Sequence, residues 1–144
     1  MDEKILLLME EILRKNAEHI KKFLQKNNVN LSVKEMLLLA QITKLRDTSQ
    51  NSTTDIANEL NITPSAVSIS LKQLEKKSFL YRYHDIDDRR KIFIGLTKQT
   101  QVLVKSFLQY QSHIINQMTS SLHQVKQKDF LASIYEMSNN IKNI

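Results

Sequence analysis

The stretch from Ser52 to Thr97 places the strongest constraint on the fold of this chain. It begins with two short segments of helical periodicity, separated by the turn Asn61-Ile62-Thr63. Two extended segments follow, residues 80–84 and 91–97, which are rich in aromatic and β-branched residues and enclose a polar tip. This order of elements predicts a helix-turn-helix followed by a β-hairpin wing.

The second helix of this pair has the clearest start signal in the chain. Thr63 can accept a hydrogen bond from the first turn, and Pro64 can occupy the first helical position, where its missing N–H costs nothing. Val67, Leu71 and Leu74 recur at helical spacing and predict the buried face of this helix. The cap, the proline and the apolar spacing therefore all predict a helix that starts at Pro64.

The opposite face of the same helix is predicted to contact DNA. In a helix-turn-helix, residues near the start of the second helix enter the major groove most deeply. Ser65, Ser68 and Ile69 are therefore the predicted base-reading residues, and Lys72 and Lys76 follow them on the same face.

Positive charge is concentrated in the same region. Residues 64–98 contain eight Lys or Arg residues against four Asp or Glu, a net charge of +4 out of the total of +6. Three consecutive cations, Arg89, Arg90 and Lys91, lie at the predicted hairpin tip. Clustered cations repel one another, and neutralisation of phosphates is a common reason for such clustering. The region is therefore predicted to bind double-stranded DNA.

Long helices are predicted on both sides of this region. Helical apolar spacing covers residues 2–26, a capping box at Ser32 and Glu35 opens a helix at Val33, and a second box at Ser52 and Asp55 opens the next. Residues 47–51 read as a loop. From Lys98 a helix is predicted through residue 122, then a break at residues 124–128, then a final helix.

Composition sets further limits. The chain has 144 residues with one Gly, one Pro and no Cys, which favours a mainly α fold and excludes disulfides and thiolate metal sites. Neither a membrane span nor a signal peptide is recognisable, so we expect a cytoplasmic protein without a membrane partner. Because no nucleophile with an oriented base and no histidine cluster is evident, we expect no enzyme activity, no cofactor and no metal site.

Several motifs together resemble the MarR family of bacterial transcription regulators. They are residues 60–68, the run Leu74-Glu75-Lys76-Lys77, the pattern Asp88-x-Arg90, and the strand end Leu96-Thr97. The resemblance covers essentially the whole chain. It implies a winged helix-turn-helix region at residues 31–97 and dimerisation helices at residues 1–30 and 98–144.

The resemblance also implies roles for single residues and partners. The protein would be a homodimer that binds a palindromic site, with Arg90 in the minor groove and Asp88 structuring the wing by pairing with an arginine. Phe107 and Tyr110 would belong to a pocket for a small-molecule effector, for which ordinary core packing at helical spacing is the alternative.

The chain departs from the family pattern at three positions. Ile69 stands where relatives often have an arginine, and an apolar side chain there would contact thymine methyl groups, which predicts an A·T-rich operator. Ser78 stands where a glycine is frequent, at a cost near 1 kcal/mol if the residue is left-handed. Thr100 replaces another frequent glycine. The predicted function is a dimeric repressor, and the alternative is a winged-helix protein-interaction module that does not bind DNA.

Overall fold

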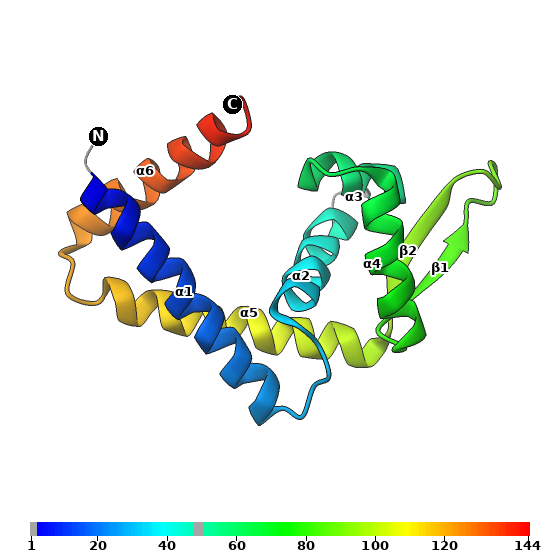
Figure 1. Ribbon diagram of the computed structural model, residues 1–144, viewed down its shortest axis with the longest axis horizontal. Helices are drawn as coiled ribbons and strands as arrows, with labels where there is room; N and C mark the ends of the chain where they lie inside the picture. Colours follow the sequence, from blue (N-terminus) through cyan, green and yellow to red (C-terminus); the bar gives the residue numbers. More distant parts are fainter. Residues whose placement is uncertain (1–2, 48–50) are drawn as a thin grey trace. The chain divides into compact units, whose positions relative to one another are not determined.

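The computed structural model describes residues 3–47 and 51–144 (Figure 1). The chain divides into two compact units, one ending at Leu108 and one spanning Gln109–Ile144. The elements are α1 (Glu3–Lys26), α2 (Val33–Asp47), α3 (Thr53–Leu60), α4 (Pro64–Lys76), β1 (Leu80–His84), β2 (Ile92–Leu96), α5 (Lys98–Thr119) and α6 (Gln124–Ile141). The predicted mainly α fold with a small β-hairpin wing is confirmed. Residues 48–50, part of the predicted loop, lie outside the described residues.

Each helix of the first unit contributes one apolar face to a common core. The three predicted inner residues of α4 are each at most 1% exposed. The other fully buried core residues include Ile20, Met36, Leu39, Ile42, Ile56, Ala57, Ile94, Leu96, Val104 and Phe107. Leu60, the last residue of α3, is only half-buried.

The predicted starts of α2, α3 and α4 are confirmed in atomic detail. Ser32 and Glu35 form a reciprocal capping box, with N···O distances of 2.8 and 3.1 Å, and Ser52 and Asp55 form another. The Thr63 hydroxyl accepts a hydrogen bond from the backbone N–H of Ala66 at 3.2 Å. These caps satisfy backbone donors that the helix itself leaves unpaired.

Three helices end in the same left-handed motif. Asn28, Asn61 and Ser78 have φ angles of 51°, 51° and 64°, and each lies one or two residues after the last residue of a helix. After α4, Ser78 donates its backbone N–H to Glu75 and Phe79 donates to Leu74, the pattern of a Schellman motif. Asparagine tolerates this conformation well, whereas serine is strained there.

The hairpin is anchored to the segment that precedes α3. β1 and β2 pair antiparallel, with Leu80 opposite Leu96 and His84 opposite Ile92. Asn51, only 6% exposed, accepts a backbone hydrogen bond from Ile94 at 3.0 Å and donates its side-chain amide to the Ile94 carbonyl at 2.9 Å. A bridge between Ser52 and Phe93 continues this contact. Residues 51 and 52 therefore pair with β2 and anchor the hairpin to the start of α3.

An aromatic row covers the outer face of the hairpin. The ring centroids of Tyr81 and Tyr83 lie 6.1 Å apart, and those of Tyr83 and Phe93 lie 5.6 Å apart. Gly95 pairs with Tyr81, and a Cβ atom at position 95 would lie only 2.3 Å from the Tyr81 ring. The glycine therefore allows the tyrosine ring to lie across β2.

The second unit corrects one prediction. The predicted break at residues 124–128 is wrong: α5 ends at Thr119, residues 120–123 form the connection, and α6 begins at Gln124. The Gln127 side chain donates to the carbonyls of Thr119 and Leu122, both at 3.1 Å, which fastens the first turn of α6 to the end of α5. Within the described residues, no helix is both long and apolar enough to span a membrane.

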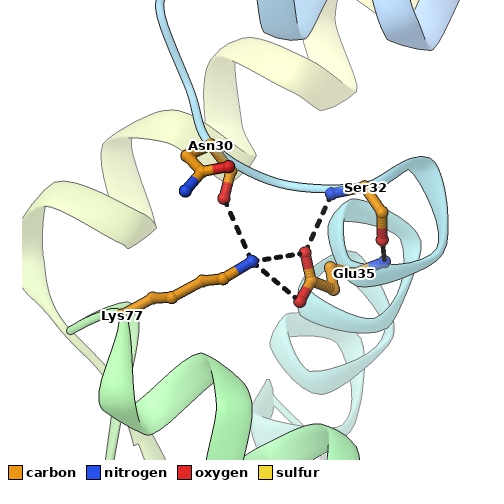
Figure 2. Close-up of polar contacts among 4 residues, drawn as sticks. All are labelled: Asn30, Ser32, Glu35 and Lys77. Atoms are coloured by element: carbon orange, nitrogen blue, oxygen red, sulfur yellow. Dashed lines mark hydrogen bonds and ion pairs between the residues drawn. The ribbon is translucent and has the colours of Figure 1, made fainter.

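A polar cluster fixes the end of α4 against the start of α2 (Figure 2). The Lys77 ammonium donates to both carboxylate oxygens of Glu35 at 3.1 Å and to the Asn30 carbonyl at 3.3 Å. Burial of Glu35, whose side chain is 14% exposed, favours a higher pKa. The backbone N–H of Ser32 and the Lys77 charge outweigh this effect and hold the pKa of Glu35 below its ordinary value.

Ser78→Gly is expected to stabilise the protein by about 0.5–1 kcal/mol. Relief of about 1–2 kcal/mol of left-handed strain exceeds the extra entropy that glycine gives the unfolded chain, about 0.4–1 kcal/mol. Urea unfolding at fixed protein concentration measures the change. Ser106→Gly, on the exposed face of α5, is the matched control and should destabilise by about 0.5 kcal/mol. A loss of stability in Ser78→Gly would contradict the presence of backbone strain at Ser78.

Glu35→Gln is expected to lower the free energy of unfolding at neutral pH. The pKa of Glu35 is lower in the folded protein than in the unfolded chain. The ionised carboxylate therefore contributes its full share to the free energy of unfolding above pH about 4.5, and this share is lost as the pH falls through the folded pKa. The difference between the variant and the unsubstituted protein should therefore shrink on acidification in urea titrations. Glu11→Gln, on the exposed face of α1, controls for the loss of one carboxylate. If the difference in unfolding free energy does not vary with pH, the ionised Glu35 does not stabilise the protein through this cluster.

Candidate nucleic-acid interface

The first turns of α4 present the predicted base-reading residues outward. Burial of Val67 and Leu71 turns the opposite face of the helix to solvent. Ser65 is exposed, Ser68 is half-buried, and the Ile69 side chain is 62% exposed. Lys72 and Lys76 are exposed further along the helix. The helix thus offers two hydroxyls, one apolar side chain and two cations along one side.

The tip of the wing is a turn built by its own aspartates. Asp85 Oδ1 accepts the backbone N–H of Asp87 at 3.2 Å, and Asp88 Oδ1 accepts that of Arg90 at 3.0 Å. The His84 ring nitrogen Nδ1 lies 2.9 Å from the Arg89 carbonyl. Such side-chain bonds to nearby backbone favour turns over regular structure. These local hydrogen bonds fix the backbone of the turn that carries the three cations, without contacts to the core.

The three cations at the tip point into solvent. Arg89, Arg90 and Lys91 are all exposed, and the Arg90 side chain is 92% exposed. Asp88 contacts an arginine, as we expected of it, but the partner is Arg90 itself, with Nε 3.3 Å from Oδ1. An ion pair this exposed contributes little stability. Arg90 therefore keeps most of its freedom to reach a partner.

A groove of about 770 Å³ brings part of the predicted set together. It lies between the starts of α3 and α4 and the wing, and four predicted residues line it: Ser65, Ser68, Arg90 and Lys91. Ile69, Lys72, Lys76 and Arg89 are not among its lining residues. Hydroxyls and cations around one hollow are the groups that bind phosphate oxygens.

The same groove contains residues that the sequence analysis missed. Thr53 and Thr54, in the first turn of α3, line the groove together with Arg82 of β1. A signal for the threonines was present, because the capping box at Ser52 and Asp55 places them at a helix N-terminus, where backbone N–H groups attract anions. No sequence pattern pointed to Arg82.

Two cations that entered the charge count are paired with acidic residues of the protein itself. Lys77 is bound to Glu35 and Asn30, and Arg82 lies 3.3 Å from Glu75. The cations that remain exposed near the groove are those on the outer face of α4 and at the wing tip. The positive surface is therefore narrower than the composition of residues 64–98 suggests.

The structure places the two residues of the candidate effector pocket in different surroundings. Phe107 is 2% exposed, and its ring contacts that of Phe23 edge to face at a centroid distance of 5.5 Å. Tyr110 lies in the second unit and is half-buried. Phe107 therefore serves as a core residue, and the effector pocket stays a prediction.

Comparisons with known proteins match part of the chain to one family model and to two curated relatives. The MarR family model matches residues 31–92, which run from two residues before α2 to the first residue of β2. Two curated relatives come from Bacillus subtilis (strain 168). The uncharacterised HTH-type transcriptional regulator YwhA is 29% identical over 84 residues, and YdgJ, of the same description, is 27% identical over 106 residues. These alignments cover 58% and 74% of this chain, but only 60% and 65% of the relatives.

Solved structures share the fold over nearly the whole chain. The structure of S. aureus MepR in a complex with DNA has a TM-score of 0.76 at 24% identity and covers 93% of this chain and 96% of MepR. Streptococcus pneumoniae FabT, also solved with DNA, has a TM-score of 0.78 at 18% identity and covers 96% and 98%. The chain therefore has a winged helix-turn-helix fold, and its residues 31–92 match the MarR family model.

Proposed function

We propose that the protein is a homodimeric, sequence-specific DNA-binding regulator of transcription. The observation that carries this proposal is the shared groove, which joins the exposed start of α4 to an exposed cationic wing. One element then enters the major groove of a duplex while the other follows its backbone and minor groove. The relatives' description as transcriptional regulators and the DNA complexes of MepR and FabT support the same function rather than an enzyme.

Within this proposal, each part of the interface has its own task. Ser65, Ser68 and Ile69 contact base edges, and Lys72, Lys76, Arg89 and Lys91 neutralise phosphates. Arg90 reaches the minor groove, and Thr53 and Thr54 bind a phosphate at the start of α3. Sequence is read mainly by α4, whereas the wing contributes affinity and register.

Apolar helix surfaces support the homodimer. In α1 the large apolar side chains between Ile5 and Leu13 are 43–66% exposed, and in α6 those between Phe130 and Ile141 are 45–71% exposed. Large exposed apolar patches are typical of interaction surfaces. A second copy of the chain covers these helices in the proposed dimer, and two-fold symmetry then implies a palindromic operator.

The regulator acts in this proposal as a repressor that occupies a promoter. Ile69, which is 62% exposed and donates no hydrogen bond, favours thymine methyl groups and hence an A·T-rich site. A small-molecule effector that releases the protein from DNA completes the proposal. The competing function is a winged-helix module that binds another protein and no DNA, but an exposed run of three cations at the tip favours DNA.

Selection from a random duplex library tests the proposed function. We expect the bound fraction to contain an A·T-rich palindrome with half-sites about 10 base pairs apart, and light scattering to give twice the 16.8 kDa mass of the chain. Absence of binding at low salt would favour the protein-interaction module. A G·C-rich site would refute the role of Ile69 alone, and a monomer would refute the dimer.

Arg90→Ala is expected to weaken binding to the selected duplex and to reduce the slope of log K against log salt by about 0.9, because a guanidinium in the minor groove displaces about one counterion, as a phosphate contact does. Its melting temperature should stay unchanged, since the side chain is 92% exposed. Fluorescence anisotropy across a salt titration measures the slope. Lys105→Ala, at an exposed site on α5, removes the same charge and should leave the slope intact. Equal slopes for both variants would remove the wing tip from the interface.

A further inference from the structure

Arg82 of the wing contacts two residues of α4. Its side chain lies on the face of β1 that also carries the buried Leu80, and it is 21% exposed. Nη2 donates a hydrogen bond to the Ser68 carbonyl at 3.4 Å. Nε lies 3.3 Å from Glu75 Oε2, an ion-pair distance, although the buried N–H is not aligned with that oxygen as a hydrogen bond requires. One guanidinium therefore contacts two positions of α4.

The two contacted residues lie about two turns apart along the helix. Ser68 belongs to the turn that carries the proposed base-reading residues, and Glu75 lies seven residues later, about 10 Å along the helix axis. The strand that carries Arg82 leads directly to the wing tip. A planar guanidinium with several fixed donors holds such a geometry in a way that a flexible ammonium does not. Arg82 thus fixes α4 relative to β1 in both distance and rotation.

A direct phosphate contact is the competing role for Arg82, because the residue also lines the groove. Its burial argues against that role: the Arg82 side chain is 21% exposed, whereas that of Arg90 is 92% exposed. One N–H group of Arg82 is already donated to the Ser68 carbonyl, and the nearby Glu75 carboxylate would repel a phosphate. The observed contacts favour an internal role.

We propose that Arg82 is a positioning residue for DNA recognition, setting the distance between the base-reading turn of α4 and the wing so that both engage one duplex in register. This inference rests on the proposed function. It assigns sequence discrimination, rather than general affinity for DNA, to a residue that contacts no base. Non-specific binding depends on phosphate contacts and tolerates small changes in this distance, whereas base readout does not.

The experiment compares two duplexes, the sequence selected by the unsubstituted protein and a scrambled duplex of the same composition. Arg82→Met retains the length of the side chain and removes both contacts. We expect its discrimination between the two duplexes to fall about tenfold, the share of one well-placed base contact. The salt slope on the scrambled duplex should not change. Arg90→Met, the same substitution at the exposed tip, should instead lower that slope.

Two further variants separate positioning from charge and from folding. Arg82→Lys keeps the positive charge but cannot hold both acceptors, so its discrimination should stay low; full recovery would reduce the role of Arg82 to charge and overturn the proposal. Glu75→Gln weakens one contact from the half-exposed side of α4 and should lower discrimination less than Arg82→Met does. It provides the decisive comparison if circular dichroism shows that Arg82→Met is unfolded.

The outcomes distinguish this inference from the proposed function. Unchanged discrimination in a folded Arg82→Met, or in Glu75→Gln if Arg82→Met does not fold, overturns the positioning role and leaves the DNA-binding function intact. A lower salt slope in Arg82→Met assigns the residue to phosphate binding and also overturns the inference. If the unsubstituted protein binds neither duplex, the proposed function fails and the role of Arg82 fails with it.

Discussion

Burial of one face of α4 is the constraint on which the rest of the structure depends. Val67, Leu71 and Leu74 are almost fully removed from water, and turning this helix about its axis would expose them while burying lysines. The rotation of α4 is therefore fixed by hydrophobic burial, which is strong but not directional. Polar contacts then refine its position: Thr63 caps its start, Lys77 fastens its end to α2, and Arg82 joins its middle to the wing.

Features that depend on local interactions could be predicted from the sequence. Helix starts were predictable because capping boxes and the Thr63-Pro64 pair act over three or four residues, and these local bonds form in the structure. Helix faces followed from the spacing of apolar residues. The exposed cations of the wing tip followed from its composition. Each of these features depends on neighbours in the chain and is encoded locally.

Contacts between distant residues were not predictable in this way. Lys77 and Glu35 are 42 positions apart, and Asn51 is 43 positions from Ile94, so no spacing rule connects them. Counting charges therefore treated Lys77 and Arg82 as free cations, although each is paired with an acidic residue of the protein. The misplaced break near residue 124 has a different cause: the polar run after His123 was taken as a loop, but it forms the exposed first turn of α6, and Gln127 bonds back to α5.

The contact between Gly95 and Tyr81 has a consequence for how this chain can diverge. Any side chain at position 95 would occupy the space of the tyrosine ring, which would have to swing away from β2 and lose its neighbour Tyr83. Replacement of the only glycine in the chain is thus tied to a change on the opposite strand. Among natural descendants of this sequence, positions 81 and 95 should vary as a pair, with a smaller residue at 81 wherever the glycine has been lost.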